Sequence, residues 1–362
     1  MNISRIEQDG RALSLARLTL GQLLIALVAV GAIVVALLML FGAERGLTIS
    51  HTEVDGIPVT VFAPRDEPPA PSVLIGHGFA GSRQLMHPFA VTLARNGYVA
   101  VTFDFPGHGR NRTPLAGTIG EPERAEALLD AFARVARYAR TRPGSDGRLA
   151  TLGHSMAGDI LVRYADDDPE VDASVAVSPY LSRELGEGGP RNLLFVYGEY
   201  EPAMIVEQGR EALAAVADAP PTDVELAVTY GDMGDGSARR LIVADGVEHI
   251  GVLYSATSLN AALDWLNQTY GRDSSGVVDA RGPWLGLFYL GAVLLAWPLS
   301  RLLPRVALEP LGANLRWRRL LPLAIAPALL TPLILWPLPS DFLPIVIGDY
   351  IALHFGLYGL LT

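Results

Sequence analysis

Two hydrophobic patterns alternate along the middle of the chain. Short apolar runs bounded by turn residues predict buried strands, and they are Val59–Ala63, Val73–Gly76, Val99–Phe103, Leu149–Leu152, Val171–Ser178, Leu193–Gly198 and Leu241–Val243. Helical spacing is found at Gln84–Arg95, Glu121–Thr141, Met156–Ala165 and Val252–Tyr270. Thr48–Glu53 precedes the first run across Asp55-Gly56 and should pair with it as a hairpin. Strands that alternate with helices predict an α/β fold, with a mostly parallel sheet covered on both faces.

Four longer apolar blocks break this alternation. They are Leu18–Phe41, Pro283–Leu303, Leu320–Leu338 and Phe342–Leu361. Blocks of this length and low charge are typical of membrane-spanning helices. The chain is therefore divided into a cytoplasmic N-terminus (1–17), a transmembrane anchor (18–41), an α/β domain (43–282) and a C-terminal membrane region with about three helices (283–362).

Basic residues indicate the orientation of these blocks. Arg5, Arg11 and Arg17 precede the first block, and the second and third blocks are separated by Arg301, Arg305, Arg316, Arg318 and Arg319. Basic loops stay in the cytoplasm, so residues 43–282 should lie on the outer, periplasmic or extracellular side of a bacterial membrane. Phe41-Gly42-Ala43-Glu44 is a poor cleavage site, which favours an uncleaved anchor over a signal peptide. The Arg asymmetry also disfavours buried core helices.

The composition agrees with a globular domain joined to membrane segments. The chain is 50% hydrophobic and 18% charged, and it has no cysteine, which excludes disulfides and thiolate chemistry. Residues 43–282 hold 33 acidic residues against 20 arginines, a net charge near −13. Such a surface repels polyanions, so we expect no nucleic-acid partner.

A serine stands where a predicted strand turns into a helix. The hexapeptide Gly153-His154-Ser155-Met156-Ala157-Gly158 follows the apolar run Leu149–Leu152 and opens the helix from Met156. Small residues are needed around such a serine because the strand and helix backbones pass close together and the serine is strained. The fifth position of the usual G-x-S-x-G pattern is Ala157, a mild departure.

Other polar loops follow other predicted strands. The glycine-rich loop His77–Ser82 could turn backbone N–H groups inward, as anion stabilisation requires. Phe103–Gly109 contains Asp104 and His108, for which a structural role is favoured because they precede the serine. Acidic residues occur in Gly198–Pro202, and a histidine in Gly246–Gly251. Serine, then acid, then histidine is the chain order of an α/β-hydrolase.

Residues 43–282 resemble the α/β-hydrolase-fold serine hydrolases. The resemblance rests on HGFAGS, FDFPGHG, GHSMAG, GEYEP and EHIG. It implies that Ser155 is the nucleophile, that His249 is the general base and acid, and that Glu201 orients His249, with Glu199 as the less favoured alternative. After Ser155 the only other histidine is His354, in the last apolar block.

The resemblance also implies an oxyanion hole and a reaction class. The backbone N–H groups of Phe79 and Met156 should form the hole. The expected activity is hydrolysis of esters, thioesters or amides through an acyl-enzyme, carboxylesterase- or lipase-like, with acyl transfer or peptidase activity as variants. A small-molecule or lipid acyl group and the bilayer are the expected partners; no cofactor or metal is implied, and the oligomeric state stays open.

A second hypothesis assigns the function to the membrane region. In that case the hydrolase-like domain is a catalytically silent ectodomain, and Asp349 and His354 serve transport or assembly, since ionisable groups inside a membrane are functional candidates. Retention of all the expected triad and oxyanion positions favours catalysis. Asp232–Ser237 hints at a calcium loop but lacks the spacing, so a surface turn is expected.

Overall fold

The computed structural model describes residues 18–362, apart from residues 66, 118–120, 184, 186–188, 218, 275, 304–315, 340–341 and 343–344. The chain forms two units, Met1–Gly42 with Arg281–Pro322 and Ala43–Ala280 with Leu323–Thr362. The predicted cytoplasmic segment 1–17, Arg305 and the predicted outer turn at Asp341 lie outside the described residues.

A single sheet forms the centre of the α/β domain. Its described strands follow the order β1-β2-β4-β3-β5-β6-β7-β9-β8. Their bounds are β1 Leu47–Val54, β2 Ile57–Pro64, β3 Ala70–Gly76, β4 Val99–Phe103, β5 Ser145–His154, β6 Val171–Val177, β7 Leu193–Gly198, β8 Thr229–Tyr230 and β9 Arg239–Ala244. From β4 to β9 neighbouring strands run parallel, whereas the β1–β2 hairpin and β8 are antiparallel. The predicted mostly parallel sheet is therefore present.

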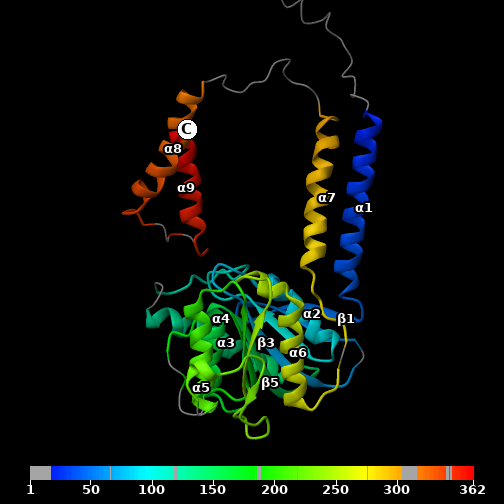
Figure 1. Cartoon of the computed structure of the whole chain (residues 1–362), viewed down its shortest axis with the longest axis vertical. Coiled ribbons are helices and arrows are strands. Elements are labelled where there is room, and N and C mark those ends of the chain that lie inside the picture. Colours follow the sequence, from blue (N-terminus) through cyan, green and yellow to red (C-terminus); the bar gives the residue numbers. More distant parts are fainter. Residues whose placement is uncertain are drawn as a thin grey trace, which may run out of the picture. The chain divides into compact units, whose positions relative to one another are not determined.

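Helices cover both faces of this sheet (Figure 1). On one face lie α3 (Pro122–Thr141), α4 (Met156–Asp167) and α5 (Ala203–Ala217), and on the other lie α2 (His87–Arg95) and α6 (Ala256–Tyr270). Two predicted helices begin as short 3₁₀ turns, Arg83–Met86 before α2 and Gly251–Tyr254 before α6.

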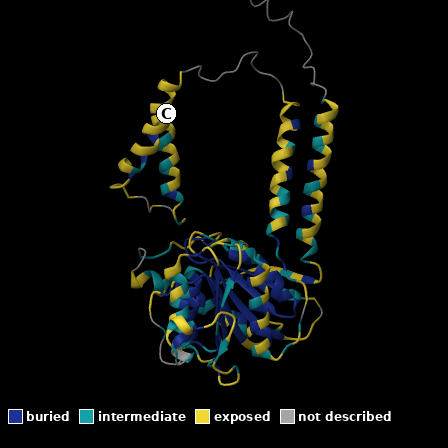
Figure 2. Cartoon of the chain, in the orientation of Figure 1, coloured by how far each residue is buried: buried dark blue, intermediate teal, exposed yellow. Residues whose placement is uncertain are grey.

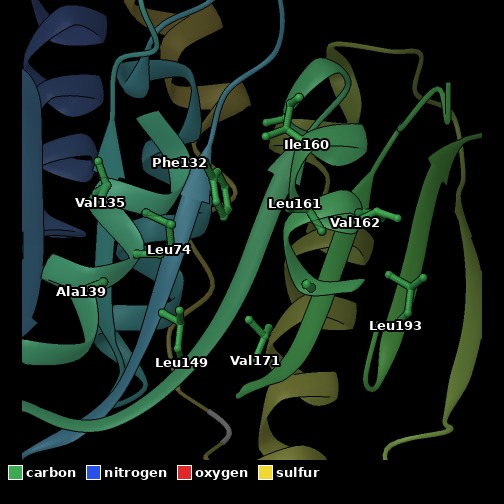
Figure 3. Close-up of a cluster of buried hydrophobic side chains, with 14 of the residues drawn as sticks. Leu74, Phe132, Val135, Ala139, Leu149, Ile160, Leu161, Val162, Val171 and Leu193 are labelled. Carbon is green, nitrogen blue, oxygen red and sulfur yellow. The ribbon is translucent and has the colours of Figure 1, made fainter. Parts of the chain in front are cut away.

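Each face of the sheet has its own apolar core. On the α3–α4 side, side chains of β3, β5, β6 and β7 meet those of the helices, including Leu74, Phe132, Leu149, Leu161, Val171 and Leu193 (Figure 3). β3 and β7 are buried throughout and β5 is buried from Leu149 onward, as the dark blue sheet in Figure 2 shows. Burial on both faces explains why their sequences read as continuous apolar runs.

Helices α1 (Leu20–Gly42) and α7 (Gly282–Ser300) lie side by side in the first unit (Figure 1). They approach closely at Gly291, where an added Cβ would lie 2.8 Å from Ile33 Cγ1 and 3.0 Å from the Ala29 carbonyl oxygen. Small residues at a contact let two apolar helices pack backbone against backbone, as in membrane bundles. The other side chains of both helices are mostly exposed (Figure 2).

Three described helices are long and apolar enough to cross a membrane, namely α1, α7 and α8 (Trp317–Leu335). The last apolar block is shorter than expected, because α9 comprises only the 14 residues Gly348–Leu361. At about 1.5 Å per residue this helix extends roughly 21 Å, less than the hydrocarbon thickness of about 30 Å. Asp349 lies in its first turn and accepts the backbone N–H of Phe342 (2.6 Å).

The topology places the predicted loops at one edge of the sheet. β3, β5, β7 and β9 all run parallel, so their carboxyl ends meet at that edge. The loop from His77, Ser155, Glu201 and His249 follow these four strand ends. Residues far apart in sequence are thereby brought to one place.

Candidate active site

Ser155 lies at a strained turn between β5 and α4. Its backbone has φ 54° and ψ −115°, a left-handed conformation that is costly for a residue with a side chain. Position 153, two residues before Ser155, requires glycine, because a Cβ there would lie 2.6 Å from Leu161 Cδ2 and 2.7 Å from the Ala157 carbonyl oxygen. The tight turn lifts the Ser155 side chain out of the sheet at the head of a helix.

The unusual Ala157 is accommodated by a glycine on the neighbouring strand. Ala157 is fully buried, and a Cβ built on Gly76 would lie only 2.8 Å from its methyl carbon. Gly76 pairs with Gly153 in the parallel β3–β5 register. The space for the extra methyl group in the elbow is thus supplied by Gly76.

Three side chains from separate loops form a hydrogen-bonded chain. His249 Nε2 lies 2.9 Å from Ser155 Oγ, and His249 Nδ1 lies 3.1 Å from each carboxylate oxygen of Glu201. These are the distances of a nucleophile, a base and an orienting acid. The structure therefore brings together Ser155, His249 and Glu201.

Glu199 is not part of this hydrogen-bonded series of side chains. Its side chain is exposed, and Glu199 Oε2 accepts the backbone N–H of Gly246 at 2.7 Å. The Glu201 side chain, in contrast, is fully enclosed beside the imidazole. Of the two acids that the sequence left open, the geometry favours Glu201.

The charges of Glu201 and His249 support each other. Burial is the largest single effect and raises the pKa of the Glu201 carboxyl, but the hydrogen bonds from His249 and Ser178 and the nearby histidine charges together outweigh it, so the net shift is downward. The same hydrogen bond raises the pKa of His249, against an opposing effect of burial. With Glu201 ionised and holding the Nδ1 proton, His249 Nε2 is left as the acceptor for the Ser155 hydroxyl.

The loop after β3 lies against Ser155. A Cβ on Gly78 would lie 3.1 Å from Ser155 Cβ. The Gly78 carbonyl oxygen accepts from Gly81 N–H (3.1 Å) and from His77 Nδ1–H (2.8 Å), which fixes the turn that contains Phe79. Met156 is the first residue of α4, so its N–H is one of the donors a helix leaves without an intrahelical partner.

Asp104 and His108 lie in a separate network after β4. Asp104 is buried; it forms an ion pair with the Arg83 guanidinium and accepts the backbone N–H groups of Arg83 (2.8 Å) and Arg110 (2.9 Å). His108 Nδ1 donates to the Pro106 carbonyl oxygen (2.8 Å). These contacts hold two loops in place, and Arg83 is a partner that no sequence motif indicated.

His154 makes a contact that its position in the motif did not indicate. The sequence assigned it no chemistry, yet its Nε2 lies 2.8 Å from the carbonyl oxygen of His249. The two imidazole rings are 4.8 Å apart between centroids. No periodicity or spacing could have revealed a contact between residues so distant along the chain.

The described residues contain no cluster of three or more His, Asp or Glu side chains suited to a metal ion. Asp232 and Asp235 each accept a backbone N–H two residues later, those of Gly234 (2.6 Å) and Ser237 (2.7 Å). Such Asx turns are typical of surface loops.

The chain is similar to known hydrolases. Residues 67–219 match the Hydrolase_4 family, described as serine aminopeptidase, S33. Cutinase 2 of Thermobifida cellulosilytica is 26% identical over 121 residues, which is 33% of this chain and 44% of that protein. Cutinase 1 of the same organism is 29% identical over 126 residues, again 33% of this chain and 44% of the relative.

A solved structure described as a candidate dienelactone hydrolase from Klebsiella pneumoniae has a TM-score of 0.46 and 19% identity, covering 63% of this chain and all of that one. The chain spans less than half the length of the cutinases it matches. The family match includes Ser155 and Glu201 and ends before His249. The domain has the predicted α/β-hydrolase fold, and its similarities support a hydrolase-like function.

Proposed function

We propose that the protein is a membrane-anchored serine hydrolase that cleaves an acyl ester, thioester or amide through an acyl-enzyme. The observation that carries this proposal is the chain of hydrogen bonds from Ser155 Oγ through His249 to Glu201. A serine is a weak nucleophile unless a neighbouring base takes its proton. Here that base lies 2.9 Å away.

The first half of the reaction forms the acyl-enzyme. Ser155 Oγ attacks the acyl carbonyl carbon while His249 Nε2 takes the hydroxyl proton, and Glu201 stabilises the resulting imidazolium. The negative charge on the carbonyl oxygen is met by the N–H groups of Phe79 and Met156. The tetrahedral intermediate collapses when His249 gives its proton to the leaving alcohol, thiol or amine.

The second half repeats these steps with water. His249 takes a proton from a water molecule, whose oxygen attacks the acyl carbonyl carbon, and then returns the proton to Ser155 Oγ as the acid leaves. An alcohol in place of water would give acyl transfer by the same steps. No cofactor is needed, because the three side chains activate the nucleophile themselves.

Side chains near the strand ends favour an apolar acyl substrate. Phe79, Tyr180, Tyr200 and Ile250 are exposed, and each lies within three residues of a site residue or of the end of β6. Exposed apolar groups gathered around a site are typical of binding surfaces for apolar ligands. Carboxylesters and lipids are therefore preferred over peptides as substrates.

We further propose that α1 and the C-terminal helices anchor the domain on the outer side of the membrane. The support is the apolar length of α1, α7 and α8 together with the arginines between α7 and α8. A domain held in this way would act on acylated molecules of the membrane or the envelope.

The test is labelling of the full chain in membranes with a fluorophosphonate probe, which reacts only with an activated serine. Ser155→Ala and His249→Ala should each abolish labelling, a loss of at least about 10³-fold for members of such a triad. Ser50→Ala and His51→Ala change the same residue types at exposed positions of β1 and should label like the wild type.

A folded wild-type protein that the probe does not label would refute the proposal. That result would favour the silent-ectodomain hypothesis and direct attention to the membrane region.

A further inference from the structure

We propose that His154 is a positioning residue that holds the loop of His249 and the oxyanion loop in register around Ser155. The inference rests on the proposed function, since it concerns how the same site is kept in its reactive geometry. His154 is the last residue of β5, directly before the nucleophile, and it is buried.

The contact to His249 is made with its main chain. His154 Nε2 donates to the His249 carbonyl oxygen at 2.8 Å. This bond fixes the peptide plane that follows His249, and the direction of an imidazole depends on the backbone that carries it. The rigid end of β5 therefore controls the base as well as the nucleophile.

A second contact of His154 reaches the oxyanion loop. A Cβ on Gly78 would lie 2.8 Å from His154 Nδ1 and 3.3 Å from its Cε1, so the Gly78 backbone lies directly against the imidazole. Gly78 precedes Phe79, whose N–H is expected to face the oxyanion. One side chain thus contacts the two loops that must keep their positions during the reaction.

His154 makes this contact as a neutral imidazole. Burial lowers its pKa to about 4, and the charge of His249 acts in the same direction, although the hydrogen bond to the His249 carbonyl oxygen and the charges of Glu201 and Glu248 oppose the shift. His77, on the oxyanion loop, is also kept neutral, because burial lowers its pKa to about 4. His249 must become positively charged during the reaction, and a neutral neighbour 4.8 Å away does not repel that charge.

The expected effect is on turnover. A displacement of about 1 Å in a catalytic group can cost roughly 100-fold in rate. Loss of the donor at position 154 should therefore lower kcat about 10- to 100-fold, while KM changes little because His154 is buried away from the substrate.

Three substitutions separate the hydrogen bond from simple packing. His154→Phe keeps a ring and removes the donor. His154→Gln carries an amide N–H group near the position of Nε2, whereas His154→Asn is too short to reach the His249 carbonyl oxygen. Thr151→Val is the matched control, because it removes a buried hydrogen bond (Thr151 to Ser174, 3.0 Å) from the same strand without touching the site.

The measurements use the full chain in detergent: kcat and KM with p-nitrophenyl butyrate, the rate constant of fluorophosphonate labelling, and Tm. We expect His154→Phe and His154→Asn to lower kcat and the labelling rate 10- to 100-fold. His154→Gln should keep both within about fivefold of the wild type. Thr151→Val should lower Tm and leave kcat unchanged.

Two results would overturn the inference. One is a kcat within twofold of the wild type in all three variants, and the other is a fall in kcat that Gln does not reverse although the variant is folded. If Ser155→Ala and His249→Ala still label, the proposed function itself fails. If those two lose labelling and only the position 154 results disagree, the inference alone fails.

Discussion

The pair formed by Gly76 and Ala157 makes the sharpest test of how the nucleophile turn is built. A Cβ at position 76 would lie 2.8 Å from the Ala157 methyl carbon, whereas two carbons pack best at about 3.5–4.0 Å. Gly76→Ala must therefore push the start of α4 away from β3 by roughly 0.7 Å or more. Both residues are enclosed, so the strain cannot be relieved into solvent.

The size of the effect follows from the cost of overpacking. Inserting a methyl group into a close-packed core costs about 1–3 kcal/mol of unfolding free energy. In a domain of this size that loss lowers Tm by roughly 2–12 °C. Because the displaced helix begins directly after Ser155, we also expect a lower rate of fluorophosphonate labelling.

The second substitution relieves the first. Ala157→Gly alone should cost about 1 kcal/mol, from greater backbone freedom and a lost methyl contact. In the double variant the close contact between positions 76 and 157 is gone. Its unfolding free energy should therefore exceed the value expected from adding the two single losses by about 1–2 kcal/mol. Full wild-type stability is not expected, because the new Cβ still lies 3.3 Å from Phe105 Cε2.

The assay is thermal unfolding of the full chain in detergent, followed by tryptophan fluorescence, to which Trp265 contributes as the buried tryptophan of the α/β domain. Labelling of Ser155 at 25 °C is measured in parallel. Additive losses in the double variant would refute the reasoning, because they would mean that positions 76 and 157 do not compete for the same space.

Two further predictions concern charge and topology. Glu201→Gln removes the carboxylate that raises the pKa of His249. Since the base must be neutral, the acid limb of the kcat/KM profile should move to lower pH, and kcat should fall about 10²- to 10⁴-fold. Glu199→Gln should change neither quantity, and a pH–rate profile of each variant checks both expectations. The chain has no native cysteine, so a single introduced cysteine reports on which side of the membrane it lies. Glu53→Cys should react with a membrane-impermeant maleimide in intact cells, and Arg301→Cys should react only after permeabilisation. The reverse pattern would invert the proposed orientation.

Much of the fold could be predicted because its signals are local. The buried strands read as apolar runs, and the amphipathic spacing of Glu121–Thr141 marks α3 to within one residue. Burial of the sheet on both faces, not the identity of any single residue, produced those runs. The 14-residue length of α9 was not foreseen, because an apolar block does not reveal where its helix starts.

The site was predictable only where its residues lie in motifs. Ser155 and His249 follow predicted strands, so their loops could be expected at one edge of the sheet. The choice between Glu201 and Glu199 depends on the direction of two side chains in the turn after β7, which neither composition nor spacing records. One points inward to His249 and the other outward to Gly246.

The contacts of Gly76 and His154 were beyond sequence reasoning for a related cause. Each joins residues from different loops or strands. The contacts of Gly76 with Ala157 and of Gly78 with His154 depend on the parallel register that sets Gly76 against Gly153. A shift of this register by one residue would turn the side chains of β3 to the opposite faces of the sheet. The sheet register therefore helps to set the distance between Ser155 and the loop after β3, and this is why substitutions at positions 76 and 154 are expected to alter the reactivity of Ser155.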